Sequence, residues 1–387
     1  MTQAETTILD QLANPGVKAD VANLLVNDRL SYHSVLTILR DAAAGGMTAG
    51  KFSTLETLAS LLKAPGGIAV SGYVKHIAKA VIDGNPANAT WTGGSSSPEA
   101  LGNLHAHSSQ AQMTKLIGKW FLGTDLPDLS VESVGETDLG SQYKLSTNPL
   151  YGAGGAPSYL DVNQGYVGDC YFLASLGEVA LQDPNSIESM IHNDGNGAYG
   201  VRFEVDGHAD WVTVNEELPT MPSGYSYANG SNLEFANGDV AWPELIEKAY
   251  AELNAEPNAP HGAQLNAASN SYAGISAGSG YALTEITGQS VTYFGSSSLT
   301  SDASQIGAAW SANEELLVGT SSIATGNIVA DHMFEVIGYN VATDTMTLHN
   351  PWGSGYSGPL AMTFTESLAS LAAADCEVFA TKGKAIA

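Results

Sequence analysis

Apolar residues recur at helical spacing through the first 82 residues of the chain. Five successive sets place leucine, isoleucine and valine three or four positions apart, which is typical of one face of an amphipathic helix. They lie at 8–12, 21–25, 32–39, 52–62 and 68–82. Ser53 and Thr54 are candidate N-caps of the fourth helix, and Pro65-Gly66-Gly67 is its expected stop. The pattern predicts a small helical region.

A stretch rich in Gly, Pro, Asn and Ser follows these helices. Residues 84–98 contain almost no apolar side chain that could anchor them, which is typical of a linker. The apolar pattern of 101–122 predicts one more helix beyond the linker. We therefore expect residues 1–83 to form a separate helical N-terminal region, which is a candidate pro-region.

Alternating apolar and polar residues dominate from Val201 onward and predict strands. The alternating segments lie at 201–205, 211–214, 291–294, 315–318, 333–337, 346–348 and 377–379. A helix is predicted among them at 242–250, with Pro243 in its first turn, where a missing N–H costs nothing. A helix-rich half before a strand-rich half predicts an α+β fold with a site between two lobes, which we place at 99–255 and 256–387.

The charge of the chain is strongly negative and unevenly spread. Of 387 residues, 40 are acidic and 14 are Lys or Arg, which gives a formal net charge of −26. The first 98 residues are neutral, whereas 145–381 hold Arg202 and Lys248 against 27 carboxylates. Such a field repels phosphate and anionic lipid headgroups, so we expect neither nucleic acid nor a membrane surface as partner. No apolar run reaches the ~18 residues of a spanning helix.

The N-terminal residues and the number of cysteines limit the possible compartment and the possible cysteine chemistry. The first residues have neither a basic n-region nor an apolar h-region, so no Sec-type signal is expected. The compartment stays open between the cytoplasm and export by a leaderless route. Two cysteines are too few for a disulfide framework or a zinc ribbon. They leave room for one reactive thiol.

Cys170 is the candidate for that thiol. A loop with two glycines ends at Asp169, and an apolar helix is predicted from Cys170 to the stop at Asp183-Pro184. The partial positive charge of a helix N-terminus favours a thiolate there. A buried structural cysteine is the competing interpretation, since free cysteine is among the most buried residue types. Cys376, within an apolar strand, fits that bland interpretation well.

A histidine and an asparagine complete a recognisable order. His332 opens an apolar strand 162 residues after the cysteine, and Asn350 ends a strand 18 residues later. A thiolate needs an imidazole to hold its proton, and the imidazole needs an acceptor that fixes its tautomer. Gln164 can donate an amide N–H to an oxyanion beside the backbone N–H of Cys170. His349 is the natural decoy, because its side chain should point to the opposite face from that of Asn350.

The cysteine segment, Gln-Gly-x-x-Gly-Asp-Cys before an apolar helix, resembles the catalytic motif of the calpain family of cysteine proteases. Four further segments resemble family motifs in the family's order, and they lie at 211–220, 242–251, 283–288 and 350–353. The similarity covers about residues 150–380 and implies a papain-like core of two lobes. It implies these roles: Cys170 as nucleophile, His332 as base, Asn350 as orienting residue, Gln164 as oxyanion donor and Trp352 as the ring that shields the His–Asn pair.

The resemblance implies an endopeptidase that cleaves proteins or peptides through a thioester acyl-enzyme and requires no cofactor. The chain departs from the family at Tyr171, where Trp is usual, and at Asp331, where Gly is usual and where a carboxylate would stand at the rim of the cleft. No β-sandwich regulatory domain and no EF-hand loop is visible, so the regulation of animal calpains is not carried over. The first 98 residues resemble nothing in those enzymes, and the arrangement looks bacterial.

Family cores also bind calcium in each lobe. Asp161, nine residues before the cysteine, matches a family carboxylate ligand, but the second carboxylate is replaced by Val240. Asp239 is one residue away and is the candidate substitute in a weakened site. In the second lobe, the residues after the asparagine motif lack the expected carboxylate. We expect activity that is independent of calcium or only weakly assisted by it.

Three functions stay open at this point. An active endopeptidase, made as a self-processing zymogen with its own N-terminal region as inhibitor, uses every residue of the constellation. A catalytically idle calpain-like module would bind proteins without needing all four polar groups. An acyltransferase can use the same three residues. A targeting or partner-binding role for residues 1–98 competes with the pro-region. Reaction with a cysteine-directed epoxide separates the active enzymes from the idle module.

Overall fold

The structure, a computed structural model, has a mixed α+β fold that begins with a helical region, as predicted. It describes residues 3–130, 141–165, 167–220, 240–254, 269–356 and 358–383. The chain divides into two compact units: unit 1 comprises Met1–Leu126, Asn193–Gly200 and Trp211–Asn215, and unit 2 comprises Pro127–His192, Val201–Asp210 and Glu216–Ala387. No helix in the described part of the chain combines the length and apolar character that a membrane crossing demands.

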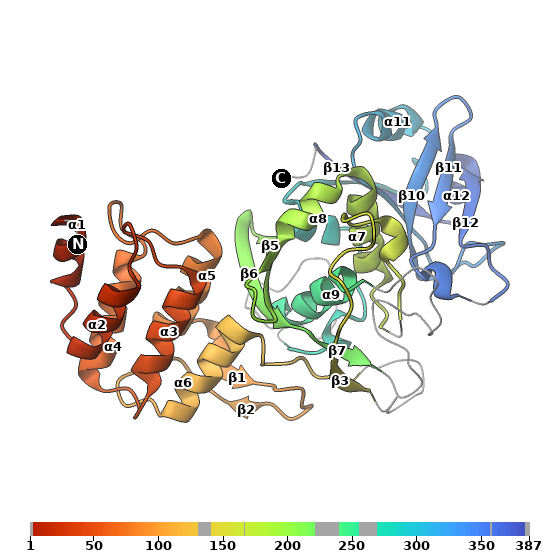
Figure 1. The fold of residues 1–387 in the computed structure, drawn as a ribbon. Coiled ribbons are helices and arrows are strands. Elements are labelled where there is room, and N and C mark those ends of the chain that lie inside the picture. Colours follow the sequence, from red (N-terminus) through yellow and green to blue (C-terminus); the bar gives the residue numbers. More distant parts are fainter. Residues whose placement is uncertain are drawn as a thin grey trace. The chain divides into compact units, whose positions relative to one another are not determined.

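The helices predicted for residues 1–82 are present in unit 1 (Figure 1). They are α1 (Gln3–Leu9), α2 (Pro15–Leu24), α3 (Tyr32–Ala43), α4 (Ala49–Leu61) and α5 (Gly72–Ile82). The N-caps of α2 to α5 accept backbone N–H groups, as Asn14 does from Gly16 and Val17. The cap predicted at Ser53 and Thr54 is wrong, because the N-cap of α4 is Thr48, five residues before Ser53, which accepts the N–H of Lys51. The first turn of α4 carries no apolar periodicity.

Residues 84–98, where we expected a linker, belong to unit 1 and are held within it by polar groups. They contain the 3₁₀ helix η1 (Pro86–Ala89) and strand β1 (Thr90–Trp91), which pairs with β2 (Glu99–Ala100). Asn88 is fully buried and accepts the indole N–H of Trp120 at 2.6 Å. The carboxylate of Asp125 accepts the N–H groups of residues 92 and 93 and pairs with Lys119 at 2.5 Å. An apolar pattern does not reveal anchors of this kind.

The helix expected at 101–122 starts late and changes its hydrogen bonding. It consists of α6 (Gln110–Ile117), capped by Ser109, and a π-helical turn η2 (Gly118–Leu122). The turn ends at Gly123, which has a φ of 60°. A Cβ at Gly123 would lie 2.3 Å from the carbonyl carbon of Val214, so only glycine fits there.

Unit 2 is built on an antiparallel sheet of six strands in the order β12-β11-β10-β9-β13-β8. Its strands are β8 (Val291–Phe294), β9 (Leu316–Gly319), β10 (Met333–Asn340), β11 (Thr345–His349), β12 (Thr363–Ser367) and β13 (Glu377–Thr381). All five strands predicted within 291–379 are therefore confirmed. The remaining strands are β3 (Gln142–Leu145) and β7 (Glu217–Thr220), which pair, and the ladder of β4 (Ile191–Asn193), β5 (Ala198–Val205) and β6 (His208–Asn215).

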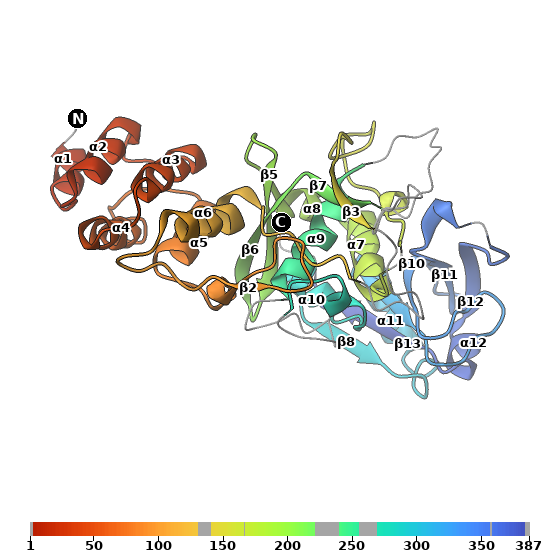
Figure 2. The ribbon, with the colours of Figure 1, turned by 90° about the horizontal axis from the view of Figure 1, so that it is seen from below.

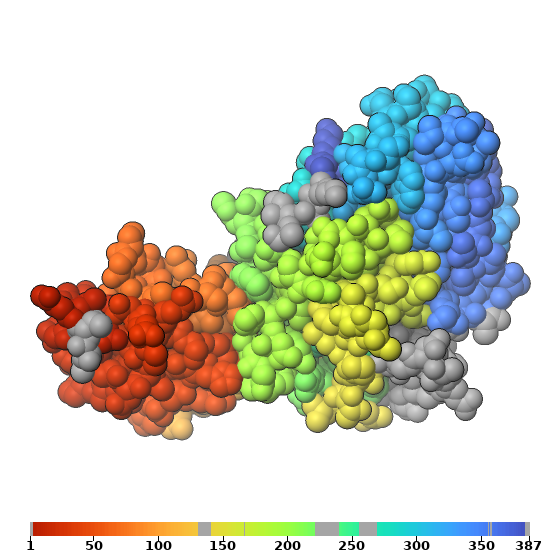
Figure 3. Space-filling model, turned by 45° about the horizontal axis from the view of Figure 1, so that its top comes forward, coloured from red at the N-terminus to blue at the C-terminus, as the bar shows by residue number. Residues whose placement is uncertain are grey.

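The helical segments of unit 2 are η3 (Tyr159–Asp161), α7 (Cys170–Gln182), α8 (Pro184–Met190), α9 (Trp242–Leu253), η4 (Ala273–Ile275), α10 (Ala282–Thr287), α11 (Ala303–Ser311), η5 (Gly353–Gly355) and α12 (Leu368–Ala373). Helices α7, α11 and α12 contact this sheet, and the other helical segments pack elsewhere in the unit. Helix α7 contacts β9 and β10, and Figure 2 shows α9 and α10 near α7. In the space-filling view, the yellow-green surface around α7 borders the blue surface of the C-terminal strands β10 to β12 (Figure 3).

The two faces of the six-stranded sheet bury different side chains. One face packs an apolar core with α11 and α12, formed by alternate strand residues such as Val318, Phe334 and Leu348. The intervening residues, Leu317, Glu335 and His349, belong to the face that α7 covers. The sheet thus places a purely apolar layer on one side and titratable groups beside the cysteine helix on the other.

Candidate active site

Cys170 is the first residue of α7, as the sequence predicted. Asp169 occupies the cap position without a side-chain cap bond, and its carbonyl accepts the N–H groups of Phe172 and Leu173 at 2.8 and 3.1 Å. A Cβ at Gly168 would lie 2.8 Å from the carbonyl oxygen of Ser276, so the loop can approach that segment only with glycine there. The loop and the helix start together present the half-buried Cys170.

His332, Asn350 and Trp352 meet at the ends of neighbouring strands. His332 directly precedes β10 and Asn350 directly follows β11. Asn350 Oδ1 lies 2.9 Å from His332 Nε2 and accepts the backbone N–H of Trp352 at 3.0 Å. The Trp352 ring lies 5.0 Å from the imidazole, centroid to centroid. His332 and Asn350 are buried, and the structure brings all three predicted residues together.

The hydrogen bonds of Asn350 define the tautomer of His332. A backbone N–H can only donate, so the Asn350 atom facing Trp352 is the amide oxygen. The same oxygen therefore accepts from His332 Nε2, which carries the proton in the neutral ring. Nδ1 is then the unprotonated nitrogen. This arrangement leaves one ring nitrogen ready to accept a proton.

The sulfur of Cys170 lies next to the histidine in the fold. The backbone N–H of Met333, the residue that follows His332, lies near enough to this sulfur to favour the thiolate form. Helix α7 packs on strand β10, so the start of the helix lies near the start of a strand that is more than 160 positions away in the sequence. Asp331, on the other side of His332, is exposed and has a φ of 49°, a left-handed conformation that Asp tolerates better than most residues. This conformation explains why glycine is usual there in the family that the sequence resembles.

Burial dominates the protonation of both groups. The pKa of the Cys170 thiol is raised to about 12, chiefly by burial; the N–H of Met333 lowers it, and Asp169 raises it. Burial lowers the pKa of His332 to about 4, against the opposing effect of its bond to Asn350. Burial therefore opposes the thiolate that the helix N-terminus favours, and it also opposes the imidazolium form of His332.

Gln164 is held between the cysteine loop and the asparagine segment. Its backbone N–H donates to the carbonyl of Pro351 at 2.7 Å, and its Nε2 donates to the carbonyl of Val167 at 2.7 Å. An amide nitrogen has two N–H groups, so one remains for another acceptor. The predicted oxyanion donor thus lies beside both motifs, with half of its donating capacity used within the loop.

The structure describes one of the two candidate calcium ligands. Asp161 Oδ2 accepts the N–H of Ser158 at 2.9 Å and the indole N–H of Trp242 at 2.8 Å, which joins η3 to the first residue of α9. Asp239 lies outside the described residues. Among the described residues, no three His, Cys, Asp or Glu side chains are grouped closely enough to hold a metal ion.

Two carboxyl groups near the site were missed by the sequence analysis. Glu178 and Glu335 are fully buried where α7 packs on β10. Each lies among apolar residues of its helix or strand, and this pattern could have identified both as buried acidic groups. His349, by contrast, is a decoy as expected, because its Nδ1 bonds to Thr363 Oγ1 at 3.0 Å and its ring packs on Tyr159.

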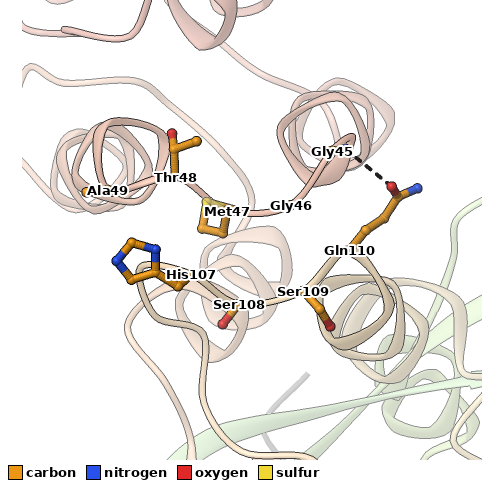
Figure 4. Close-up of a pocket in the computed structure, with 9 residues that line it drawn as sticks. All are labelled: Gly45, Gly46, Met47, Thr48, Ala49, His107, Ser108, Ser109 and Gln110. Atoms are coloured by element: carbon orange, nitrogen blue, oxygen red, sulfur yellow. Dashed lines mark hydrogen bonds between the residues drawn. The ribbon is translucent and has the colours of Figure 1, made fainter.

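One cavity of about 500 Å³ belongs to unit 1 and lies between the starts of α4 and α6 (Figure 4). Of its polar side chains, His107 is exposed, and Thr48, Ser108, Ser109 and Gln110 have partners within the unit. Gln110 accepts the N–H of Gly45, Ser108 accepts that of His105, and Ser109 accepts that of Gln112. The cavity therefore offers no unsatisfied buried side chain to a ligand.

The comparison with family models matches residues 142–366 to the description "Calpain family cysteine protease". The chain belongs to this family. Among its relatives, it is 26% identical to calpain-13 of Rattus norvegicus over 265 residues, which are 63% of this chain and 35% of the relative. It is 30% identical to calpain clp-4 of Caenorhabditis elegans over 220 residues, which are 51% and 28%. It is 31% identical to the calpain-1 catalytic subunit of Sus scrofa over 116 residues, which are 29% and 15%.

The calpain match covers the segments that carry Gln164, Cys170, His332 and Asn350. The chain spans about a third or less of the length of these three relatives, and unit 1 lies mostly outside the match. All three relatives are animal proteins, so they give no support to the bacterial type of core expected from the sequence. The family resemblance stated from the motifs is confirmed.

Proposed function

We propose that this chain is a cysteine endopeptidase with a papain-like core of two lobes. The observation that carries the proposal is the double use of Asn350 Oδ1, which accepts from Trp352 and thereby leaves His332 Nδ1 unprotonated next to the Cys170 helix. Trp352 covers the His–Asn pair from solvent. The substrates are proteins or peptides, and the chemistry needs no cofactor.

The reaction starts with proton transfer inside the pair. The Cys170 proton passes to His332 Nδ1 as the sulfur attacks the substrate carbonyl, because both groups are neutral at rest. The oxyanion receives the backbone N–H of Cys170, which has no partner within its own helix turn, and the second amide N–H of Gln164. His332 then gives the proton to the leaving amine. Water, deprotonated by His332, releases the acid product from the thioester.

A peptidyl epoxide tests this function against the idle module. The epoxide should add once to wild type, at Cys170 by peptide mapping, and should stop the hydrolysis of an unfolded protein substrate. Cys376 should stay unmodified, because it is fully buried. His332→Ala should slow the addition. Labelling of neither cysteine, with no hydrolysis, would favour the idle module; transfer of the acyl group to an added amine without hydrolysis would favour an acyltransferase.

The acid limb of the activity profile should lie unusually low. Since His332 must be neutral to accept the thiol proton and its pKa is lowered to about 4, kcat/KM should be retained as the pH falls to about 5 and should halve near 4. The measurement is kcat/KM from pH 3.5 to 7 on a peptide without titratable side chains, with circular dichroism to verify folding. A limb near pH 6.5 would mean that the imidazole is not desolvated in the working enzyme.

Residues 1–98 are proposed to be removed by the enzyme itself. The exposed turn Ser95–Pro98, between β1 and β2, is the part of the former linker that a protease can engage, because residues 87–88 and 92 are buried. Incubated wild type should lose about a hundred N-terminal residues while Cys170→Ala stays intact, by intact-mass analysis. Activity should rise with cleavage if the N-terminal region inhibits. If wild type stays full length under active conditions, self-processing is wrong and residues 1–98 are left with a targeting or partner-binding role.

Calcium is proposed to be dispensable. Asp161 already bonds to Ser158 and Trp242, and a site for this ion needs six to eight oxygens. Hydrolysis in chelator should stay within about twofold of that in millimolar calcium, and Asp161→Asn should change thermal stability more than calcium dependence. Activity that disappears in chelator and returns with micromolar calcium would contradict this.

A further inference from the structure

Glu178 lies buried inside the apolar helix that begins with Cys170. Its Oε2 accepts the backbone N–H of Val336 on β10 at 3.1 Å, and its Oε1 accepts the backbone N–H of Leu316 on β9 at 3.3 Å. Gln182, one turn further along α7, donates to Oε1 at 3.1 Å. One side chain of the cysteine helix therefore binds two strands of the sheet.

The place where Glu178 binds explains its role in the fold. The ladder between β10 and β9 ends at the pair Glu335–Leu317. The next two residues, Val336 and Leu316, direct their N–H groups to Glu178 instead of to each other's strand. A buried N–H without an acceptor is costly, so the carboxylate completes the sheet where its strands separate. Removal of Glu178 would leave two such groups and would also detach α7 from β10.

Glu335 lies on the same side of the sheet and faces the helix. It is fully buried, and a Cβ at Gly177 would lie 2.2 Å from its Oε1, so the helix approaches it only with glycine at that position. Among the described residues, neither of its oxygens has a hydrogen-bond partner. Two titratable groups face it: Glu178 on α7, and His349 directly opposite on β11, whose Nε2 is also buried without a described partner. Glu315, just before β9, acts on Glu178 and raises its pKa.

The surroundings of Glu335 disfavour its charge. Burial raises the pKa of Glu335 well above its usual value, and Glu178 raises it further. Burial also raises the pKa of Glu178, but the three N–H groups that Glu178 accepts lower it, whereas Glu335 accepts none. We therefore assign the proton of the pair to Glu335.

We propose that Glu178 and Glu335 are positioning residues that hold the Cys170 helix against the His332 strand through a buried acid pair with one proton. Glu178 lies eight residues after Cys170, about 12 Å along the helix, and Glu335 lies three residues after His332, about 10 Å along the strand. A change of spacing at the acid pair therefore reaches both reacting side chains through rigid elements. The proposal rests on the proposed function for its catalytic consequence, but not for its structural one.

The acid pair makes both the fold and the site depend on pH in a defined direction. Unfolded Glu335 loses its proton at about pH 4.5, whereas folded Glu335 keeps it to a higher pH. The stabilising contribution is thus complete below about pH 4.5 and is lost as the pH rises toward the folded pKa. Once Glu335 ionises, two carboxylates share a dry space, and α7 is expected to move away from β10.

The test compares Glu335→Gln with a matched buried variant. Asp194→Asn is the control, because Asp194 is also buried with a raised pKa but belongs to unit 1 and accepts a hydrogen bond from Tyr73 rather than acting on α7. Thermal midpoints at pH 5 and 8.5, and the rate of Cys170 alkylation followed by mass at both values, need no proteolysis. The ratio of kcat/KM at pH 8.5 to that at pH 6 is measured on the same samples. Glu335→Leu repeats the test with a side chain that cannot ionise, should the glutamine variant not fold.

Wild type should lose at least about 3 °C more than Glu335→Gln between pH 5 and 8.5. The rate of Cys170 alkylation in wild type should change with pH differently from the rate in Glu335→Gln. The ratio of kcat/KM at pH 8.5 to that at pH 6 should be several-fold lower in wild type than in the variant. Glu178→Gln should lower kcat about tenfold or more at every pH with KM within twofold, because one N–H loses its acceptor. If Glu335→Gln and Glu335→Leu follow wild type in midpoint and alkylation, or if Asp194→Asn changes both as they do, the acid pair is not the positioning device. Shifted midpoints and alkylation without hydrolysis by any variant would support the acid pair while refuting the protease.

Discussion

Replacement of Cys170 by alanine should reduce peptide-bond hydrolysis by at least about 10³-fold, to the level of the uncatalysed background. The sulfur is the atom that forms the bond to the substrate, and no other thiol can replace it, since Cys376 is fully buried. His332→Ala should have an effect of the same size, because the buried thiol has a pKa of about 12 and needs the imidazole to accept its proton. The measurement is kcat/KM on a peptide library with equal amounts of folded enzyme.

The loss of activity in Asn350→Ala shows whether this residue orients His332 or takes part in the reaction itself. Asn350→Ala should retain about 1–10% of the activity, because it removes only the acceptor that fixes the ring of His332. The double variant with His332→Ala should be no worse than His332→Ala alone. Cys376→Ala is the control and should keep full kcat/KM. Full activity in Cys170→Ala would refute the protease, and additive losses in the double variant would show that Asn350 acts independently of the histidine.

The order of helices and strands could be predicted from the sequence, because hydrophobic periodicity is a local signal. The strand that follows His332 and the strand that precedes Asn350 are rich in apolar residues, and the helix of Cys170 is apolar from its first turn. Boundaries were less predictable. The helix α4 starts at Ala49 with polar residues, and residues 84–98 are held by Asn88 and Asp125 rather than by apolar side chains. Such polar anchors depend on partners far along the chain.

The predicted site residues lie together in the structure, but their protonation could not be predicted from the sequence. A helix N-terminus favours a thiolate in water, yet burial next to Met333 has the larger effect on Cys170. Desolvation depends on how the elements of unit 2 pack together and has no local sequence motif. The same holds for Glu178, whose two backbone donors on β9 and β10 become visible only once the helix is placed on the sheet.

Substitution of Gly353 by alanine should damage both stability and activity, because this glycine lies where two functional segments touch. It is buried, has a φ of 64°, and a Cβ there would lie 2.2 Å from Asn163 Oδ1 and 2.7 Å from the carbonyl oxygen of Val162. The first segment continues to Gln164, and Gly353 itself follows Asn350 by three residues. The methyl group would push these segments apart, and no flexible side-chain end can yield, since a carbonyl of the backbone is involved.

The expected cost can be divided by a matched control. Gly207→Ala has a similar φ of 74° with nothing within 4 Å, so it reports the left-handed strain alone, about 1–2 kcal/mol. Gly353→Ala adds overpacking of about 1–3 kcal/mol, for a total of about 2–5 kcal/mol by urea unfolding. Its kcat/KM should fall at least about tenfold at a temperature where it is folded, whereas Gly207→Ala should match wild type. Equal losses of stability in the two variants, with activity retained in both, would mean that the Asn163 and Asn350 segments are not in contact in the working enzyme.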